Sequence, residues 1–153
     1  MVGTYDGTIV CFTLETGKEV WKTNVGSMIK SKGICCKGLL YIASYDGNIR
    51  CIHVLTGEIK HTIKVTEQAI SADLVLAKQE YILLGTLTGV CASIHTDSKT
   101  VAWRGTLSSP VFASPALYDS DKYVVFAEVN GEIHCRTVEK GIKIWKYQGA
   151  KGN

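Results

Sequence analysis

Six cysteines and four histidines are the side chains of this sequence best suited to bind a metal ion or to act as nucleophiles. No two cysteines are spaced as C-x-x-C, the arrangement typical of zinc sites and thiol-redox motifs. Cys11, Cys51 and Cys135 lie at equivalent positions of an internal repeat. We therefore interpret them as small buried apolar side chains on equivalent strands, not as ligands of one ion.

The histidines and carboxylates form no recognisable catalytic constellation in the sequence. Three histidines fall on expected strands, and spacing places no carboxylate beside them: His53, His95 and His134. Asp6 and Asp46 precede glycines and are interpreted as turn residues. The sequence also lacks a Gly-rich phosphate loop, a nucleophile elbow and a dinucleotide fingerprint. It therefore predicts no catalytic residue, no metal ligand and no cofactor-binding residue in this segment.

The charge of the chain is small and evenly distributed. Its 17 basic and 14 acidic residues give a net charge of +3, without runs of five or six like charges. We therefore expect no nucleic-acid partner and no membrane binding. Apolar runs, such as 123–127, have the length of strands rather than of membrane-spanning helices. The N-terminal residues lack the pattern of a secretory signal, so we expect reduced thiols and a cytoplasmic location.

A repeat of about forty residues must position all of these side chains. Four segments share the same order of residue types: GTYDGTIVCFTLETGKEVWK from Gly3, ASYDGNIRCIHVLTGEIKH from Ala43, GTLTGVCASIHTDSKTVAW from Gly85 and AEVNGEIHCRTVEKGIKIW from Ala127. The steps between them are 40, 42 and 42 residues. Repeats of this period indicate a repeat architecture rather than a single irregular domain.

Each copy contains the signals of a four-stranded antiparallel meander. Three copies carry Asp-Gly or Asn-Gly at the first turn: Asp6-Gly7, Asp46-Gly47 and Asn130-Gly131. These dipeptides favour hairpins because the tight turn requires positive φ. A strand-length apolar run precedes this turn, and an alternating strand, a second turn and a short last strand follow it. A further apolar segment precedes the middle strands of the later copies, at 33–36, 72–77 and 111–117.

Four strands every 40–42 residues are typical of the blades of a β-propeller. We therefore predict an all-β fold, a partial propeller over residues 1–148 with blade boundaries near 1–30, 31–66, 67–107 and 108–148. The chain would begin within the second strand of its first blade, giving about three and a half blades of a larger ring. Residues 149–153 are predicted to be a disordered tail.

The order of Asp6-Gly7, Thr16-Gly17-Lys18 and Trp21 resembles the PQQ-type propeller repeat, as does SSPVFASP at 108–115. This resemblance covers essentially the whole chain. WD repeats have a similar period, but the Gly-His and Trp-Asp dipeptides that mark them are absent. In PQQ-type repeats, the tryptophan of the last strand docks one blade on the next.

This role is therefore implied for the tryptophans that end three of the copies: Trp21, Trp103 and Trp145. His61 takes the place of the tryptophan in the second copy. The resemblance thus implies a degenerate repeat with one weaker junction at His61.

A narrower resemblance is to the C-terminal propeller of the β-alanine-activating enzyme family of acyl-CoA synthetases. It is carried by FAEVNGEIHC at 126–135 and by Cys35-Cys36 ahead of a strand. Such proteins resemble one module of a non-ribosomal synthetase, with an adenylating domain, a carrier domain and a propeller. The resemblance implies a non-catalytic binding or scaffold domain within an enzyme that activates β-alanine or a similar carboxylic acid. Its partners would be the remaining blades, the upstream domains and a carrier domain or other protein, and the parent would use ATP, Mg²⁺ and phosphopantetheine.

Two other functions stay open. One is a quinoprotein dehydrogenase with PQQ and calcium in the central funnel, but the sequence does not place its base or its calcium-binding carboxylates. Some quinoprotein dehydrogenases carry a disulfide between adjacent cysteines, which makes Cys35 and Cys36 a candidate redox pair. Neighbouring strand residues face opposite sides, however, so this pairing requires a strained geometry. The other function is an envelope scaffold that helps to assemble outer-membrane proteins.

Overall fold

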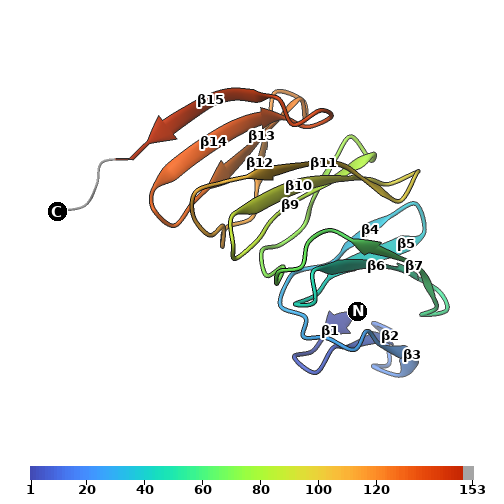
Figure 1. Cartoon of the computed structure of the whole chain (residues 1–153). Coiled ribbons are helices and arrows are strands. Elements are labelled where there is room, and N and C mark those ends of the chain that lie inside the picture. The colour runs from blue at the N-terminus through green and yellow to red at the C-terminus, as the bar shows by residue number, and fades with distance from the viewer. Residues whose placement is uncertain (150–153) are drawn as a thin grey trace.

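The chain folds into four antiparallel β-sheets that follow one another in sequence order (Figure 1). The computed structural model describes residues 1–149, and all of their regular secondary structure is β-strand. Residues 150–153 of the predicted tail lie outside the described residues. Each sheet is a simple meander in which strands adjacent in sequence pair with each other. The prediction of an all-β propeller made of four-stranded blades is confirmed.

The four sheets are named blades 1 to 4. Blade 1 contains β1 (Val2–Gly3), β2 (Thr8–Phe12) and β3 (Glu19–Asn24). Blade 2 contains β4 (Ile34–Cys36), β5 (Leu39–Ala43), β6 (Asn48–His53) and β7 (Ile59–Lys64). Blade 3 contains β8 (Val75–Ala77), β9 (Tyr81–Gly85), β10 (Val90–His95) and β11 (Thr100–Thr106). Blade 4 contains β12 (Ala116–Tyr118), β13 (Tyr123–Ala127), β14 (Glu132–Thr137) and β15 (Lys143–Gln148).

Blade 1 has three strands instead of four, because its short β1 corresponds to the second strand of the other blades. The chain therefore provides about three and three-quarter blades. The first strand of blade 4 is shorter than the expected segment 111–117 and begins only at Ala116. Pro110 and Pro115 lack backbone N–H groups, so the preceding segment cannot pair fully with β13.

A β-bulge recurs at one repeat position in every blade. It falls between Cys11 and Phe12 in blade 1, and at the equivalent step of the other three third strands. The extra residue increases the local twist of the third and fourth strands. The recurrence shows that the repeat in the sequence extends to irregularities of the backbone.

Three apolar clusters fill the three junctions between adjacent blades. β5 shows how one strand serves two of them, since its alternate side chains point to opposite faces of the sheet. Leu40 and Ile42 belong to the cluster shared with blade 1, whereas Tyr41 and Ala43 belong to the cluster shared with blade 3. A middle blade buries both faces, which explains why its second strand, β5 or β9, is a nearly continuous apolar run.

The described part of the chain contains no helix with the length and apolar character needed to cross a bilayer.

Candidate functional site

The predicted turn residues lie at the hairpins between the second and third strands. The side chains of Asp6 and Asn130 accept hydrogen bonds from the backbone N–H groups of Thr8 and Glu132, at 3.0 Å in both cases. Gly47 has a φ of 77°, and a Cβ at this position would lie 2.0 Å from the carbonyl oxygen of Thr66. Glycine is therefore required at that turn by both conformation and space.

Two of the three predicted docking tryptophans lie between blades. The indole of Trp21 donates to the carbonyl oxygen of Val54 in blade 2 at 2.9 Å, and the indole of Trp103 donates to Val138 of blade 4 at 2.7 Å. Trp21 is buried, and Trp103 lies edge-on to Phe126 of blade 4. Trp145 lies on the last sheet of the chain with 48% of its surface exposed. Its docking role therefore stays a prediction.

The candidate redox pair lies on β4 as two free thiols. Cys35 is exposed, whereas Cys36 is buried with its sulfur 3.5 Å from the carbonyl oxygen of Gln79 in blade 3. The two side chains thus follow the strand alternation and point to opposite faces of the sheet. Of the three cysteines at one repeat position, Cys51 and Cys135 are buried and Cys11 is partly buried.

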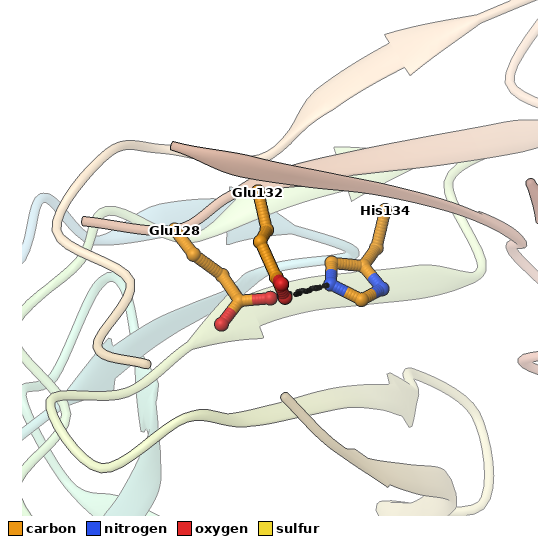
Figure 2. Close-up of side chains that lie close together, drawn as sticks. All are labelled: Glu128, Glu132 and His134. Carbon is orange, nitrogen blue, oxygen red and sulfur yellow. Dashed lines mark ion pairs between the residues drawn. The ribbon is translucent and has the colours of Figure 1, made fainter. Parts of the chain in front are cut away.

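The β13–β14 hairpin of blade 4 brings together three side chains that the sequence does not place together: Glu128, Glu132 and His134 (Figure 2). Spacing in the sequence places no carboxylate beside His134, but the folded hairpin does. Its Nε2 atom contacts Oε1 of Glu128 and lies 3.5 Å from Oε2 of Glu132. The three residues are spaced at i, i+4 and i+6 across a hairpin, so only the β13–β14 pairing brings them together.

Ser108, in the segment that leads into blade 4, connects the two carboxylates. Its hydroxyl lies 2.8 Å from Oε2 of Glu128 and 2.6 Å from Oε2 of Glu132. Asn130 donates to the same hydroxyl oxygen at 3.0 Å. A hydroxyl has a single proton, so Ser108 can donate to only one of the two carboxylates at a time. Ser108 is hydrogen-bonded to acids rather than to His134, which is not the arrangement of an activated nucleophile.

Lys146 of β15 completes the cluster. Its Nζ atom lies 2.8 Å from Oε1 of Glu132. The hydrogen bond from Lys146, together with that from Ser108, lowers the pKa of the Glu132 carboxyl to about 2 despite its burial. Glu132 is therefore ionised at neutral pH and is half of a charged pair at the surface of the cluster.

A pocket of about 440 Å³ opens beside this cluster. Side chains from blade 4 and from the end of blade 3 line it, among them Ser108, Glu132, His134 and Lys146. The arrangement of two carboxylates and one imidazole at a solvent-accessible pocket can hold a proton or a metal ion. No sequence motif indicates this cluster, although the FAEVNGEIHC segment contains Glu128, Glu132 and His134.

The equivalent hairpin of blade 2 has an arginine as the counter-ion of its acidic residue. Arg50 occupies the repeat position of His134, and its guanidinium forms an ion pair with Asp46 at 2.6 Å and a hydrogen bond with Ser44 at 2.7 Å. Burial alone would raise the pKa of Asp46, but the hydrogen bonds from Arg50, Ser44 and Asn48 hold it well below its usual range. Blade 2 therefore has its own counter-ion at this position.

The sequence of the chain matches a known protein family and two curated proteins. A family model described as "Beta-alanine-activating enzyme, beta-propeller" matches residues 1–153. The chain is 30% identical to the β-alanine-activating enzyme of Drosophila melanogaster, covering 100% of this chain and 16% of that protein. It is 25% identical to the outer membrane protein assembly factor BamB of Bordetella pertussis, covering 92% of this chain and 36% of that protein. The chain thus spans well under half of the length of both curated relatives.

A solved structure, that of BamB from Moraxella catarrhalis, has a similar fold. The TM-score is 0.68 at 14% identity, over 95% of this chain and 56% of the BamB chain. This likeness shows the propeller fold, and the sequence match to BamB of Bordetella pertussis supports a PQQ-like propeller. The match over the full sequence shows that the chain belongs to the β-propeller family of the β-alanine-activating enzymes.

Proposed function

We propose that this chain is a non-catalytic propeller region, with a binding or scaffold role, in a multidomain acyl-activating enzyme. The observation that carries this proposal is the family match over the whole chain, combined with 30% identity to a β-alanine-activating enzyme. By this relationship, the parent protein activates β-alanine or a similar carboxylic acid. It would use ATP, Mg²⁺ and a phosphopantetheine arm, all handled by other domains, and it would act in the cytoplasm.

The two outer faces of the chain support further blades of the same protein as partners. Within the chain, Trp21 packs over Gly57 and Trp103 packs over Gly141, where an added Cβ would lie 2.6 and 2.5 Å from the indole rings. The equivalent Gly17 of blade 1 has nothing within 4 Å of such a Cβ. Blade 1 thus presents a vacant acceptor turn, and blade 4 presents the exposed Trp145. A preceding blade with a tryptophan and a following blade with a glycine turn would complete both contacts.

A rigid stack of sheets suits a scaffold because its surface changes little on binding. The parent's carrier domain is the partner that we expect to use it. Fold alone does not define this task, since propellers serve many unrelated functions.

The proposal is tested first by reading the complete transcript that encodes this segment. We expect an adenylating domain and a carrier domain together with further propeller repeats. The complete propeller is then titrated with the phosphopantetheinylated carrier domain by isothermal titration calorimetry. Saturable binding supports the scaffold role, whereas a transcript that encodes only blades behind a signal peptide would overturn the assignment to an acyl-activating enzyme.

The similarity to BamB of Bordetella pertussis favours a second candidate, an envelope scaffold for protein assembly. It is weaker because the identity is 25% rather than 30%, and the family model that matches residues 1–153 is that of the β-alanine-activating enzyme propeller. A lipoprotein signal upstream of this segment would favour it over the acyl-activating enzyme.

A further inference from the structure

We propose that Glu128, Glu132 and His134 form a binding site for one divalent transition-metal ion, with Zn²⁺ as the best match. This inference goes beyond the scaffold function and does not depend on it. The three candidate ligand atoms lie within 4.8 Å of one another on one hairpin of blade 4 (Figure 2).

Two buried atoms in this cluster lack hydrogen-bond partners among residues 1–149. They are Oε1 of Glu128 and Nε2 of His134. These atoms are in contact, but without the geometry of a hydrogen bond. The side chain of Glu128 is completely buried, and its unpartnered oxygen points at the imidazole. A buried carboxylate oxygen without a donor is costly, and a cation bound to Oε1 of Glu128 would remove that cost.

The cluster has two neighbouring carboxylates and one lysine, so a further cation would stabilise it. Glu128 and Glu132 lie side by side on the single hydroxyl of Ser108, and only Glu132 is paired with a lysine. Arg136, the buried arginine of the same strand, forms no ion pair with either carboxylate in the described chain. Two neighbouring carboxylates repel each other unless a proton or a metal ion lies between them.

The comparison with blade 2 indicates that this cation comes from outside the chain. The repeat position of His134 is Arg50 in blade 2, where the guanidinium itself neutralises Asp46. In blade 4, the imidazole of His134, a neutral metal ligand, replaces this permanent cation. Glu128 and Glu132 replace Ser44 and Asn48 of blade 2. The hairpin has thus lost the Asp46–Arg50 pair, since Asn130 replaces Asp46, and it has gained three ligands, of which Lys146 of β15 neutralises only Glu132.

The ligand types select the class of metal. One imidazole nitrogen and two carboxylate oxygens suit Zn²⁺ and similar transition metals, whereas Ca²⁺ and Mg²⁺ prefer oxygen ligands alone. The pocket beside Glu132 and His134 gives an ion access and leaves room for a water as the fourth ligand. Lys146 competes with the metal for Glu132, because its ammonium group is held at 2.8 Å from the other carboxylate oxygen.

The test uses the full chain carrying Cys35→Ser, which removes the exposed thiol as a competing ligand. The protein is stripped with a chelator and titrated with Zn²⁺ by calorimetry and with Co²⁺ by visible absorption. We expect one ion per chain and cobalt bands typical of four-coordination without a thiolate charge-transfer band. Glu128→Gln and His134→Gln should each weaken binding by at least about 100-fold, because loss of a residue that only hydrogen-bonds to a ligand already weakens metal affinity by up to about 100-fold. His61→Gln, at an exposed histidine of β7, should leave the affinity unchanged.

Lys146→Met provides a second and independent readout, because removal of the competing ammonium should tighten Zn²⁺ binding. Circular dichroism of each metal-free variant shows whether it is folded, and if Glu128→Gln or His134→Gln fails to fold, Lys146→Met decides. The proposal is overturned if the chain binds no ion, if binding survives both ligand substitutions, or if Lys146→Met leaves the affinity unchanged or weaker.

Discussion

The junction between blades 1 and 2 and that between blades 3 and 4 are closed by tryptophan, whereas the junction between blades 2 and 3 is closed by tyrosine. All three use a backbone carbonyl at the same repeat position, namely Val54, Thr96 and Val138. In the outer two junctions, the donor is the indole of the fourth strand. In the middle junction, His61 stands at that position and is exposed, and the hydroxyl of Tyr41 from the second strand donates to Thr96 at 3.1 Å.

The turn that receives the donor changes with it. Gly57 and Gly141 lie directly against the indole rings, and the equivalent residue of blade 3 is Lys99. Lys99 has a φ of 58°, so the turn keeps its left-handed conformation without glycine. Glycine is needed at this position only where a tryptophan covers it, because the ring leaves no space for a Cβ.

The repeat therefore preserves a contact to the carbonyl oxygen of the neighbouring blade rather than one type of residue. The resemblance to PQQ-type repeats implies a weaker junction at His61, because it concerns only the docking residue of the fourth strand. The middle junction nevertheless holds an extensive apolar cluster that includes the fully buried Tyr41. Arg104 of β11 also donates to the carbonyl oxygens of Val65 and Lys64 of blade 2, at 2.6 and 3.0 Å. Whether this junction is weaker in energy stays a prediction.

The largest expected effect comes from removing a docking indole. Trp103→Ala should lower the free energy of unfolding by about 3 kcal/mol, because it leaves a cavity beside Phe126 and an unpaired carbonyl at Val138. Urea denaturation followed by circular dichroism measures the change. Trp145→Ala is the matched control, and it should stay within about 0.5 kcal/mol of the wild type because its side chain faces solvent. Equal losses in the two variants would contradict the docking assignment.

The acceptor glycine gives the next effect. Gly141→Ala should cost about 2 kcal/mol, because the new Cβ collides with Trp103 and the residue has positive φ. Gly17→Ala controls for the backbone, since its φ of 65° matches the 67° of Gly141 but its Cβ meets nothing. It should cost about 1 kcal/mol. In the Trp103→Ala background, the cost of Gly141→Ala should fall to that of Gly17→Ala, and simple additivity would refute the steric coupling.

At the tyrosine junction, Tyr41→Phe should cost about 1 kcal/mol, the net value of one buried hydrogen bond. The loss is limited because Lys99 also donates to the carbonyl oxygen of Thr96. Tyr118→Phe, at an exposed tyrosine, is the control and should leave stability unchanged. If Tyr41→Phe matches the wild type in urea denaturation, then the hydroxyl is not the substitute for the indole.

The smallest expected effect is a pH dependence at two surface ion pairs. Lys37 pairs with Asp97 at 2.5 Å across the middle junction, and Lys78 pairs with Glu139 at 2.9 Å across the last. The hydrogen bonds from these lysines lower the pKa values of both carboxyls. Because these folded-state pKa values lie below the unfolded ones, each pair stabilises the fold above the unfolded-state pKa and loses this contribution as the pH falls through the folded one.

The difference in Tm between the wild type and Lys78→Met should therefore shrink between pH 7 and about pH 3, where carboxyls become protonated. Differential scanning calorimetry at low ionic strength measures it, since salt screens exposed pairs. The Lys37→Met variant should show the same trend at the tyrosine junction. A difference that grows on acidification would contradict this account.

The cluster of Glu128, Glu132 and His134 in blade 4 depends on contacts that no local pattern of the sequence predicts. The alternation of strand β14 places Glu132 and His134 on one face of the sheet. Glu128, whose carboxylate contacts His134, lies on the other side of the turn before β14. Ser108 lies in the segment after blade 3. Alignment of the repeats could have raised the possibility, because Glu128 and His134 replace Ser44 and Arg50 of blade 2.

The sequence by itself determined the repeat, the all-β blades, the turn residues and the family, because hairpins depend on local patterns of glycine, polar turns and alternation. The tertiary structure decided which side chains meet between blades: Tyr41 with Thr96, Trp103 with Gly141, and Ser108 with two glutamates. These contacts join residues separated by 20 to 55 positions. They depend on how one sheet stacks on the next, which no local pattern encodes.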